Sequence, residues 1–172
     1  MDSLRTRPRI KLTPTPTQVG LSVFTAICMA AVWLIFALYY PRLPATIATH
    51  FGATGAPDAT GPKSSLVPLP VITTLTYLLF TVLIRVPHIY NYPKPITEEN
   101  AERQYGNAVA LMYWLRAEMV AMLGYIEWMI IGAVFHRTQS AQGMGLIFVP
   151  VVLILMIFAG GVVYMVRAYR DT

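Results

Sequence analysis

The stretch from Tyr40 to Lys63, YPRLPATIATHFGATGAPDATGPK, separates two long apolar segments of the chain. It holds four of the thirteen prolines, three of the eleven glycines, one of the three histidines and an isolated aspartate. Proline and glycine at this density are typical of turns, because they supply the backbone angles that turns need. We therefore predict an ordered, turn-rich loop over residues 40–66, with a turn at 58–61. Residues 45–51 could form a short strand or a turn of helix.

The rest of the chain has the composition of a membrane protein. Of its 172 residues 56% are hydrophobic and 12% are charged, about half the charged fraction of a typical soluble domain. A bilayer core of about 30 Å needs roughly 20 apolar residues of helix. Segments of about this length and composition lie at residues 20–39, 67–84, 108–135 and 143–166. We predict an all-α integral membrane protein in which four transmembrane helices form a single domain over 19–168.

The basic residues predict how the chain is oriented in the membrane. With the amino terminus in the cytoplasm, ten basic residues fall inside and only Arg42, Lys63 and Arg137 fall outside. Short loops rich in lysine and arginine stay on the cytoplasmic side. We therefore expect both termini in the cytoplasm, with residues 1–18 as an extended or disordered tail and 169–172 as a second tail. This distribution accounts for the net charge of +5 without nucleic acid as a partner.

The third span is longer than a bilayer requires. Thr97 has the character of a helix N-cap, because its hydroxyl can accept hydrogen bonds from first-turn amides. No proline interrupts the chain from there to Phe135. We predict one helix over 97–135, which begins within the inner loop and helical foot at 85–107 and continues through the membrane.

Three charged residues, Arg116, Glu118 and Glu127, lie within this third span. Because each costs about 2.5–3.5 kcal/mol on insertion scales, we expect them to face the bundle or water. Arg116 and Glu127 are eleven residues apart and share a helix face, which Glu118 does not. They indicate a proton or ion path or a polar ligand pocket; alternatively, Arg116 and Glu118 lie at the cytoplasmic interface and Glu127 alone is deep.

A metal site is a further hypothesis for the outer loop. His50 and Asp58 have donor atoms that zinc accepts, and His136 or Glu127 could complete the site near the same membrane face. The spacing matches no strong metal signature, and the alternative is that both side chains bind loop backbone. Cys28 is the only cysteine, so neither an intrachain disulfide nor a thiolate cluster can form. No catalytic motif is present, and we expect no enzymatic activity.

Two stretches resemble a known family. They are LPATIATHFGATGAPDATGPK at residues 43–63 and NYPKPITEENAERQY at 91–105. Both are similar to a small bacterial membrane domain of unknown function, which also occurs in the amino-terminal part of immunity proteins against the sporulation-delaying-protein toxin. The positions that carry the resemblance in the loop are Leu43, Pro44, His50, Phe51, Gly55, Pro57, Asp58, Gly61 and Lys63. The resemblance implies a multi-pass protein of the bacterial inner membrane, with His50, Phe51, Asp58 and Lys63 as candidate binding residues.

These observations predict a function in binding or assembly. Gly160 and Gly161 in the last span would let another helix approach closely, which favours an accessory or structural subunit that packs against other membrane proteins. One alternative is an immunity or sensor protein that binds a membrane-active peptide through the outer loop. Another is a small ion-coupled transporter that uses Arg116 and Glu127. The bilayer is the expected partner, and bound lipid, pigment or zinc are the conceivable cofactors.

Overall fold

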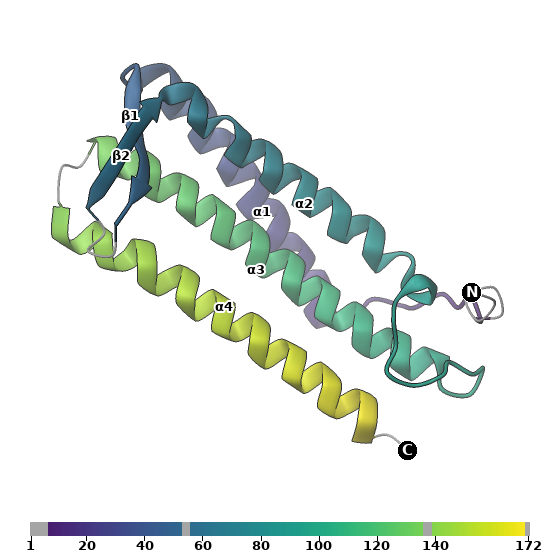
Figure 1. The fold of residues 1–172 in the computed structure, drawn as a ribbon. Helices are drawn as coiled ribbons and strands as arrows, with labels where there is room; N and C mark the ends of the chain where they lie inside the picture. Colours follow the sequence, from purple (N-terminus) through teal and green to yellow (C-terminus); the bar gives the residue numbers. More distant parts are fainter. Residues whose placement is uncertain (1–6, 53–55, 136–138, 171–172) are drawn as a thin grey trace.

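A computed structural model describes residues 7–52, 56–135 and 139–170. The elements, in chain order, are α1 (Pro16–Tyr39), β1 (Thr46–Phe51), β2 (Pro57–Pro62), α2 (Pro68–Ile84), α3 (Ala101–Phe135) and α4 (Gln139–Arg170). Single turns of 3-10 helix lie at Tyr40–Arg42, Lys63–Leu66 and Pro87–Ile89. The two strands form a hairpin at one end of the helices, and both chain ends lie at the other (Figure 1). We call these the hairpin end and the terminal end.

Helix α3 lies at the centre of the arrangement. It packs along each of the other three helices, whereas α1 and α2 have few contacts with each other. The α1–α3 contact is tight at Gly124, where a Cβ atom would lie 2.8 Å from Cγ2 of Val32. A side chain at that position would push the two helices apart. The molecule is therefore a central helix with three helices around it, and α1 and α2 lie on neighbouring sides.

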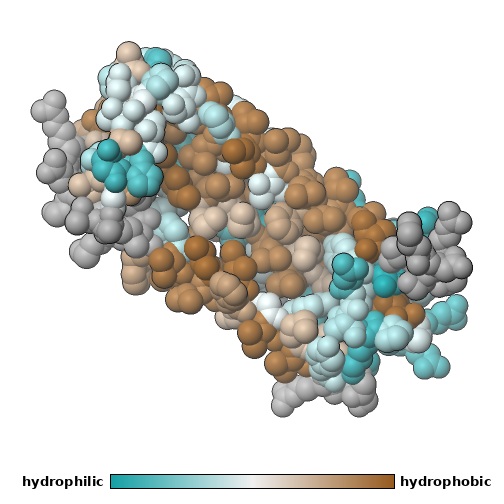
Figure 2. Space-filling model, in the orientation of Figure 1, coloured by the Kyte–Doolittle hydropathy of each residue, from teal (hydrophilic) through white to brown (hydrophobic). Residues whose placement is uncertain are grey.

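Four helical segments are long and apolar enough to cross a membrane. They are Pro16–Arg42, Lys63–Ile84, Ala101–Phe135 and Phe148–Tyr169, and these confirm the four predicted spans. Their outer faces are apolar, as lipid requires. On the face shown in Figure 2, hydrophobic residues cover the middle of the molecule and hydrophilic residues gather at both ends.

The described part of the amino-terminal segment, residues 7–15, has no regular secondary structure, and it is fastened to the helices. Helix α1 begins at Pro16, because Thr15 and Gln18 form a capping box. Before it, the Arg7 guanidinium donates to the carbonyl of Tyr90 at 2.6 Å, and the Tyr105 hydroxyl donates to the carbonyl of Pro8 at 3.1 Å. Residues 7–15 therefore run along the terminal end of the bundle.

The prediction of an all-α protein is wrong in the outer loop, which contains two β-strands. Instead of a turn at 58–61, the chain forms strand β2, which pairs antiparallel with β1. Ile47 is 4% exposed and packs with Leu43, Leu66 and Ile131, so the hairpin covers the end of the bundle. Burial of Ile47 fixes the register of β1, and β2 is added through backbone hydrogen bonds despite its poor strand composition.

The start of α3 is also corrected. The helix begins at Ala101, four residues after the predicted N-cap Thr97. The side chain of Asn100 accepts from the backbone nitrogen of Thr97 at 2.9 Å and donates to the carbonyl of Pro95 at 3.0 Å. These bonds hold residues 97–100 as a turn, because an asparagine side chain competes with the helical hydrogen-bond pattern.

Candidate functional site

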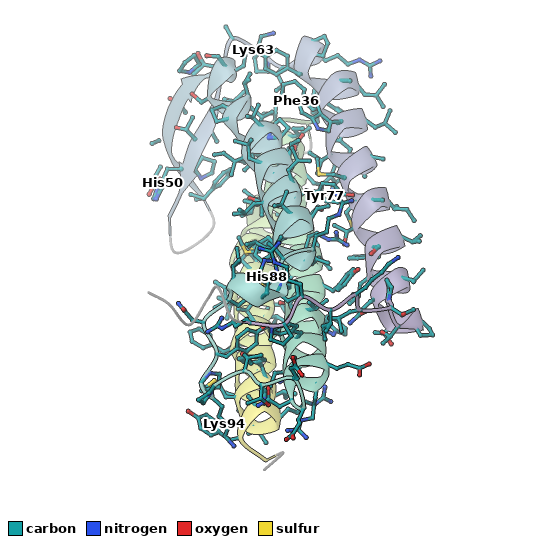
Figure 3. All side chains as sticks on the ribbon, turned by 90° about the vertical axis from the view of Figure 1, so that its right-hand side faces the viewer. Phe36, His50, Lys63, Tyr77, His88 and Lys94 are labelled. Carbon is teal, nitrogen blue, oxygen red and sulfur yellow. The ribbon has the colours of Figure 1, made fainter. Side chains whose placement is uncertain are left out.

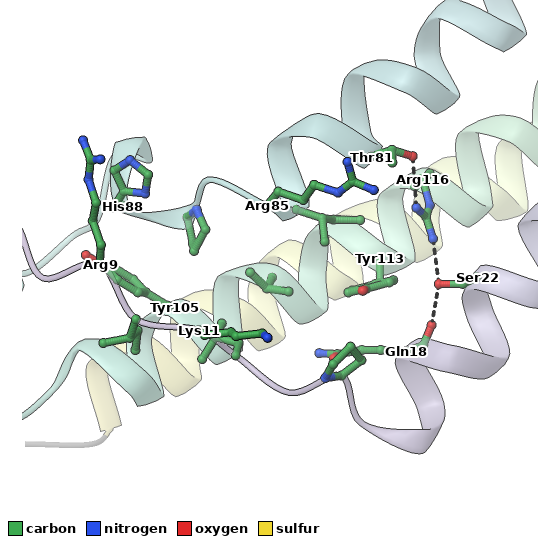
Figure 4. A pocket seen from close by; sticks show the side chains of 16 residues that line it. Arg9, Lys11, Gln18, Ser22, Thr81, Arg85, His88, Tyr105, Tyr113 and Arg116 are labelled. Carbon is green, nitrogen blue, oxygen red and sulfur yellow. Dashed lines mark hydrogen bonds between the residues drawn. The ribbon is translucent and has the colours of Figure 1, made fainter.

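Arg116 is buried in the interior of the bundle. Its side chain is 5% exposed. One terminal nitrogen donates to the Thr81 hydroxyl of α2 at 3.1 Å, and the other donates to the Ser22 hydroxyl of α1 at 2.9 Å (Figure 4). The guanidinium also lies over the rings of Tyr77 and Tyr113, at 5.4 and 5.1 Å from their centroids. One arginine thus connects the three helices that carry these residues.

The charge of Arg116 has no counter-ion within the described part of the chain. Its partners there are neutral hydroxyls and aromatic rings, and its Nε atom is buried without a hydrogen-bond acceptor. Burying a charge is costly unless it is paired or fully hydrogen-bonded. An anion or another hydrogen-bond acceptor at this site would therefore stabilise the buried charge.

Arg116 lines a cavity of about 700 Å3 at the terminal end. Three further cationic side chains, Arg9, Lys11 and Arg85, line the same cavity, together with His88 (Figure 4). Among the residues that the structure describes, none of those around this cavity carries a carboxylate. The charges around the cavity therefore favour an anion over a cation.

Three separate segments bring these cations together. Arg9 and Lys11 come from the fastened segment before α1, Arg85 follows the last residue of α2, and His88 lies in the 3-10 turn that begins at Pro87. The Arg7 side chain ties the first segment to the connection after α2, since it also donates to the carbonyl of His88 at 3.2 Å. Arg9, Lys11 and Arg85 are exposed, so the cavity is open to solvent.

Two tyrosines hold the backbone beside this cavity. The Tyr90 hydroxyl donates to the carbonyl of Leu83 at 2.5 Å, and the Tyr92 hydroxyl donates to the carbonyl of Pro87 at 2.9 Å. Burial raises the pKa of Tyr90 to about 12 and also raises the pKa of Tyr92. Both phenols are therefore neutral donors that fix the backbone around His88.

A second cavity of about 700 Å3 lies beside the first and differs in charge. It is lined by Arg103 and Arg167 but also by Glu102, between the amino-terminal segment, α3 and α4. A carboxylate there weakens the potential felt by an anion. The cavity of Arg116 is the better candidate for an anionic ligand.

The three charges predicted in α3 are all buried, but they do not form one cluster. Glu118 is 7% exposed and lines a cavity of about 330 Å3 between α3 and α4. Glu127 is 1% exposed, and neither of its carboxylate oxygens has a hydrogen-bond partner among the described residues. Eleven residues of helix separate it from Arg116, which is about 16 Å at 1.5 Å each. Protein covers both Arg116 and Glu118, and their position near the cytoplasmic interface stays a prediction.

The candidate residues of the outer loop lie at the hairpin end. His50 Nδ1 is 2.5 Å from Asp58 Oδ1, across the two strands. Their side chains are 70% and 51% exposed, and Figure 3 places His50 at the outer edge of the hairpin. The two side chains pair with each other. The alternative to a metal site expected both to bind loop backbone, and no such bond is present among the described residues. The third zinc candidate, His136, lies outside the described residues.

The other predicted binding residues have structural contacts. The Lys63 amine lies 5.0 Å from the Tyr40 ring centroid and 3.5 Å from the Tyr40 carbonyl, at the end where the hairpin joins the helices (Figure 3). Phe51 is half-buried at the end of β1. A Cβ atom on Gly160 would touch Leu111 of α3 at 3.6 Å, whereas one on Gly161 would meet nothing within 4 Å. Only Gly160 thus serves the packing of α4 on α3.

Most residues of the cavity were not predicted as site residues. The sequence identified Arg116, but Arg9, Lys11 and Arg85 were assigned only to topology. Arginine occurs at helix ends both where it sets the membrane topology and where it binds a ligand. The sequence alone therefore does not distinguish the two roles. Ser22 and Thr81 gave a weaker indication of a site. They are hydroxyl residues near the beginning of one apolar helix and the end of another, and both lie toward the same side of the molecule.

The fold and this interior define a class, that of small multi-pass membrane proteins with a polar cavity among their helices. Residues 27–74, which span the second half of α1, the hairpin and the start of α2, match a family described as "Domain of unknown function (DUF1648)". An uncharacterized protein of Archaeoglobus fulgidus is 32% identical over 153 residues, covering 77% of this chain and 80% of its own. The chain belongs to the family of this archaeal protein. No solved structure matches it.

These comparisons confirm the predicted membrane domain of unknown function. They also show that the family occurs in an archaeon. The resemblance to toxin immunity proteins and the assignment to a bacterial inner membrane stay predictions.

Proposed function

We propose that the protein is a non-catalytic binding protein of the membrane, which holds the anionic group of a ligand in the cavity at its terminal end. One observation carries this proposal. Arg116 is buried without a counter-ion among the described residues, in a cavity whose other charged lining residues are cations. An anion there would compensate the charge that the fold has buried.

The energetics favour binding at this position. Two unit charges 4 Å apart attract each other by about 4 kcal/mol at the effective dielectric constant of about 20 that is typical near a protein surface. Arginine is suited to phosphate and carboxylate groups, because its planar guanidinium can donate two parallel hydrogen bonds. After the bonds to Thr81 and Ser22, each terminal nitrogen of Arg116 has one N–H group left for an anion.

The hydroxyl groups near Arg116 support binding rather than catalysis. The Ser22 hydroxyl donates to the carbonyl of Gln18 at 2.9 Å, and the Thr81 hydroxyl donates to the carbonyl of Tyr77 at 2.7 Å. Each therefore uses its proton in its own helix and offers its lone pairs to Arg116. A nucleophile needs a base within hydrogen-bond reach, and here the neighbour of each hydroxyl is a cation.

The proposal is tested by unfolding temperature in an uncharged detergent. We expect sodium phosphate to raise the unfolding temperature of the wild type above that in sodium chloride of equal ionic strength. Arg116→Gln and Arg85→Gln should reduce or abolish this rise. Arg42→Gln, which removes an exposed cation at the hairpin end, is the matched control and should retain it. An absent rise in the wild type, or equal rises in all variants, would exclude the cavity as an anion site.

A second candidate function rests on α4. The most apolar part of this helix has no buried residue, and the side chains of Phe148 and Phe158 are 68% and 69% exposed. The helix packs mainly against α3, so most of its circumference can contact either lipid or another protein. This supports the predicted accessory-subunit role. Purification from native membranes in a mild detergent should then yield a second protein at equal stoichiometry, and a lone chain would contradict that role.

A further inference from the structure

We infer that the anionic group is the phosphate of a membrane phospholipid with a net negative charge, taken from the leaflet on the side of the two termini. This inference rests on the proposed function, and it names the ligand class of the same cavity. A free phosphate ion would satisfy the same cations. The distinction comes from where the cavity lies and from what else lines it.

The depth of Arg116 fits a lipid headgroup. Ser22 is six residues from the start of α1 and Thr81 is three residues from the end of α2, which is about 9 Å and 5 Å along the helices. The polar headgroup layer begins where the hydrocarbon core of about 30 Å ends. Arg116 therefore lies just below that boundary, and Arg9, Lys11 and Arg85 lie toward the water.

The lining is amphipathic. Beside the cations it contains the apolar residues Ile10, Leu12, Pro14, Ile84 and Val109. A soluble anion gains nothing from such surface, whereas the glycerol and first methylene groups of a lipid do. At about 700 Å3 the cavity is also far larger than one phosphate ion requires.

The arrangement of α1 and α2 allows a lipid to reach the cavity. Both helices pack on α3 and have few contacts with each other, and Arg116 joins them through Ser22 and Thr81. An acyl chain can therefore stay beside the apolar outer surface of these helices while its headgroup enters. Basic pockets between transmembrane helices on the cytoplasmic side bind anionic headgroups in this way.

The test compares three probes on the purified full-length chain in an uncharged detergent. They are dioctanoyl phosphatidylglycerol, dioctanoyl phosphatidylcholine with the same acyl chains and no net charge, and inorganic phosphate. Binding is measured by native mass spectrometry and by unfolding temperature. We expect phosphatidylglycerol to bind at least tenfold more tightly than either other probe.

The variants connect this binding to the cavity. Arg116→Gln should weaken phosphatidylglycerol binding at least tenfold, and Arg85→Gln about fivefold, as expected for one cation near a headgroup. Arg42→Gln should leave it unchanged. Arg85 is exposed, so this variant keeps the test valid even if Arg116→Gln does not fold.

Each other outcome overturns the inference. If phosphate binds as tightly as phosphatidylglycerol and the arginine variants lose both, the ligand is a soluble anion and the proposed function stands without the lipid. Equal binding of the two lipids, insensitive to Arg85→Gln, would identify nonspecific lipid at the protein surface. If no probe binds, the anion-binding function itself fails.

Discussion

At the scale of single residues, Arg116 and Gly124 set how the helices pack. Arg116 of α3 donates to Ser22 of α1 and to Thr81 of α2. Gly124 lets α1 approach α3 closely, because a Cβ atom there would lie 2.8 Å from Cγ2 of Val32.

The first residue-scale prediction concerns Gly124. Gly124→Ala should lower the free energy of unfolding by about 1–3 kcal/mol, because its Cβ would overlap Val32 and overpack the α1–α3 contact. Gly106→Ala is the matched control. Nothing lies within 4 Å of the added atom there, so the higher helix propensity of alanine should stabilise the protein slightly. Unfolding in mixed micelles measures both, and equal effects would contradict the tight contact.

A second prediction follows from Tyr90. Its pKa is about 12 in the folded protein, above the ordinary value of 10.0, because burial disfavours the phenolate. Below pH 10 the folded and unfolded states are both protonated and the full stabilisation is present. Between pH 10 and 12 the unfolded state releases the proton first, so stability falls as pH rises.

Tyr90→Phe isolates this effect. The variant should be less stable than the wild type at neutral pH, because it loses the hydrogen bond to Leu83. It should also lose less stability than the wild type between pH 10 and 12. Tyr169→Phe, at an exposed ring near the end of α4, is the control. Parallel stability curves for wild type and Tyr90→Phe would show that Tyr90 is not buried.

At the scale of elements, the helices were predictable and the hairpin was not. Four apolar runs give the spans directly, because a bilayer imposes their length. Strand β2, in contrast, has the sequence PDATGP, with two prolines and one glycine. It forms because β1 offers hydrogen bonds and packs Ile47 on the bundle, and these are tertiary contacts that local composition does not record.

The element-scale prediction is that Ile47 anchors the hairpin. Ile47→Ala should lower the free energy of unfolding by about 2–5 kcal/mol, because it leaves a cavity between Leu43, Leu66 and Ile131. Thr46→Ala, at the exposed neighbouring position, should have an effect below about 1 kcal/mol. Hydrogen exchange of the hairpin amides checks both variants. Equal protection in the two would mean that the hairpin is held by its own strands alone.

At the scale of the whole molecule, the chain order brings four separate segments to one cavity. The sequence predicts that the beginning of span one, the end of span two and the residues after span two lie at the same membrane face. It cannot predict that α3 is central, because all four spans are similarly apolar. Which face is cytoplasmic follows from the charge distribution and stays a prediction.

A labelling experiment tests this orientation. In a chain with Cys28→Ala, a cysteine in place of Thr60 should react with an impermeant thiol reagent in whole cells, and one in place of Thr97 should not. Thr60 lies on the hairpin and Thr97 in the connection at the terminal end. Reaction at residue 97 alone would reverse the orientation.

The most direct test of the central claim is the phosphorus-31 resonance of inorganic phosphate, titrated with purified protein in an uncharged detergent. Exchange with a protein site broadens this resonance even when binding is weak. We predict broadening by the wild type and by Arg42→Gln that Arg116→Gln and Arg85→Gln diminish. The same linewidth with all four proteins, or no broadening with any, would contradict an anion site built around Arg116.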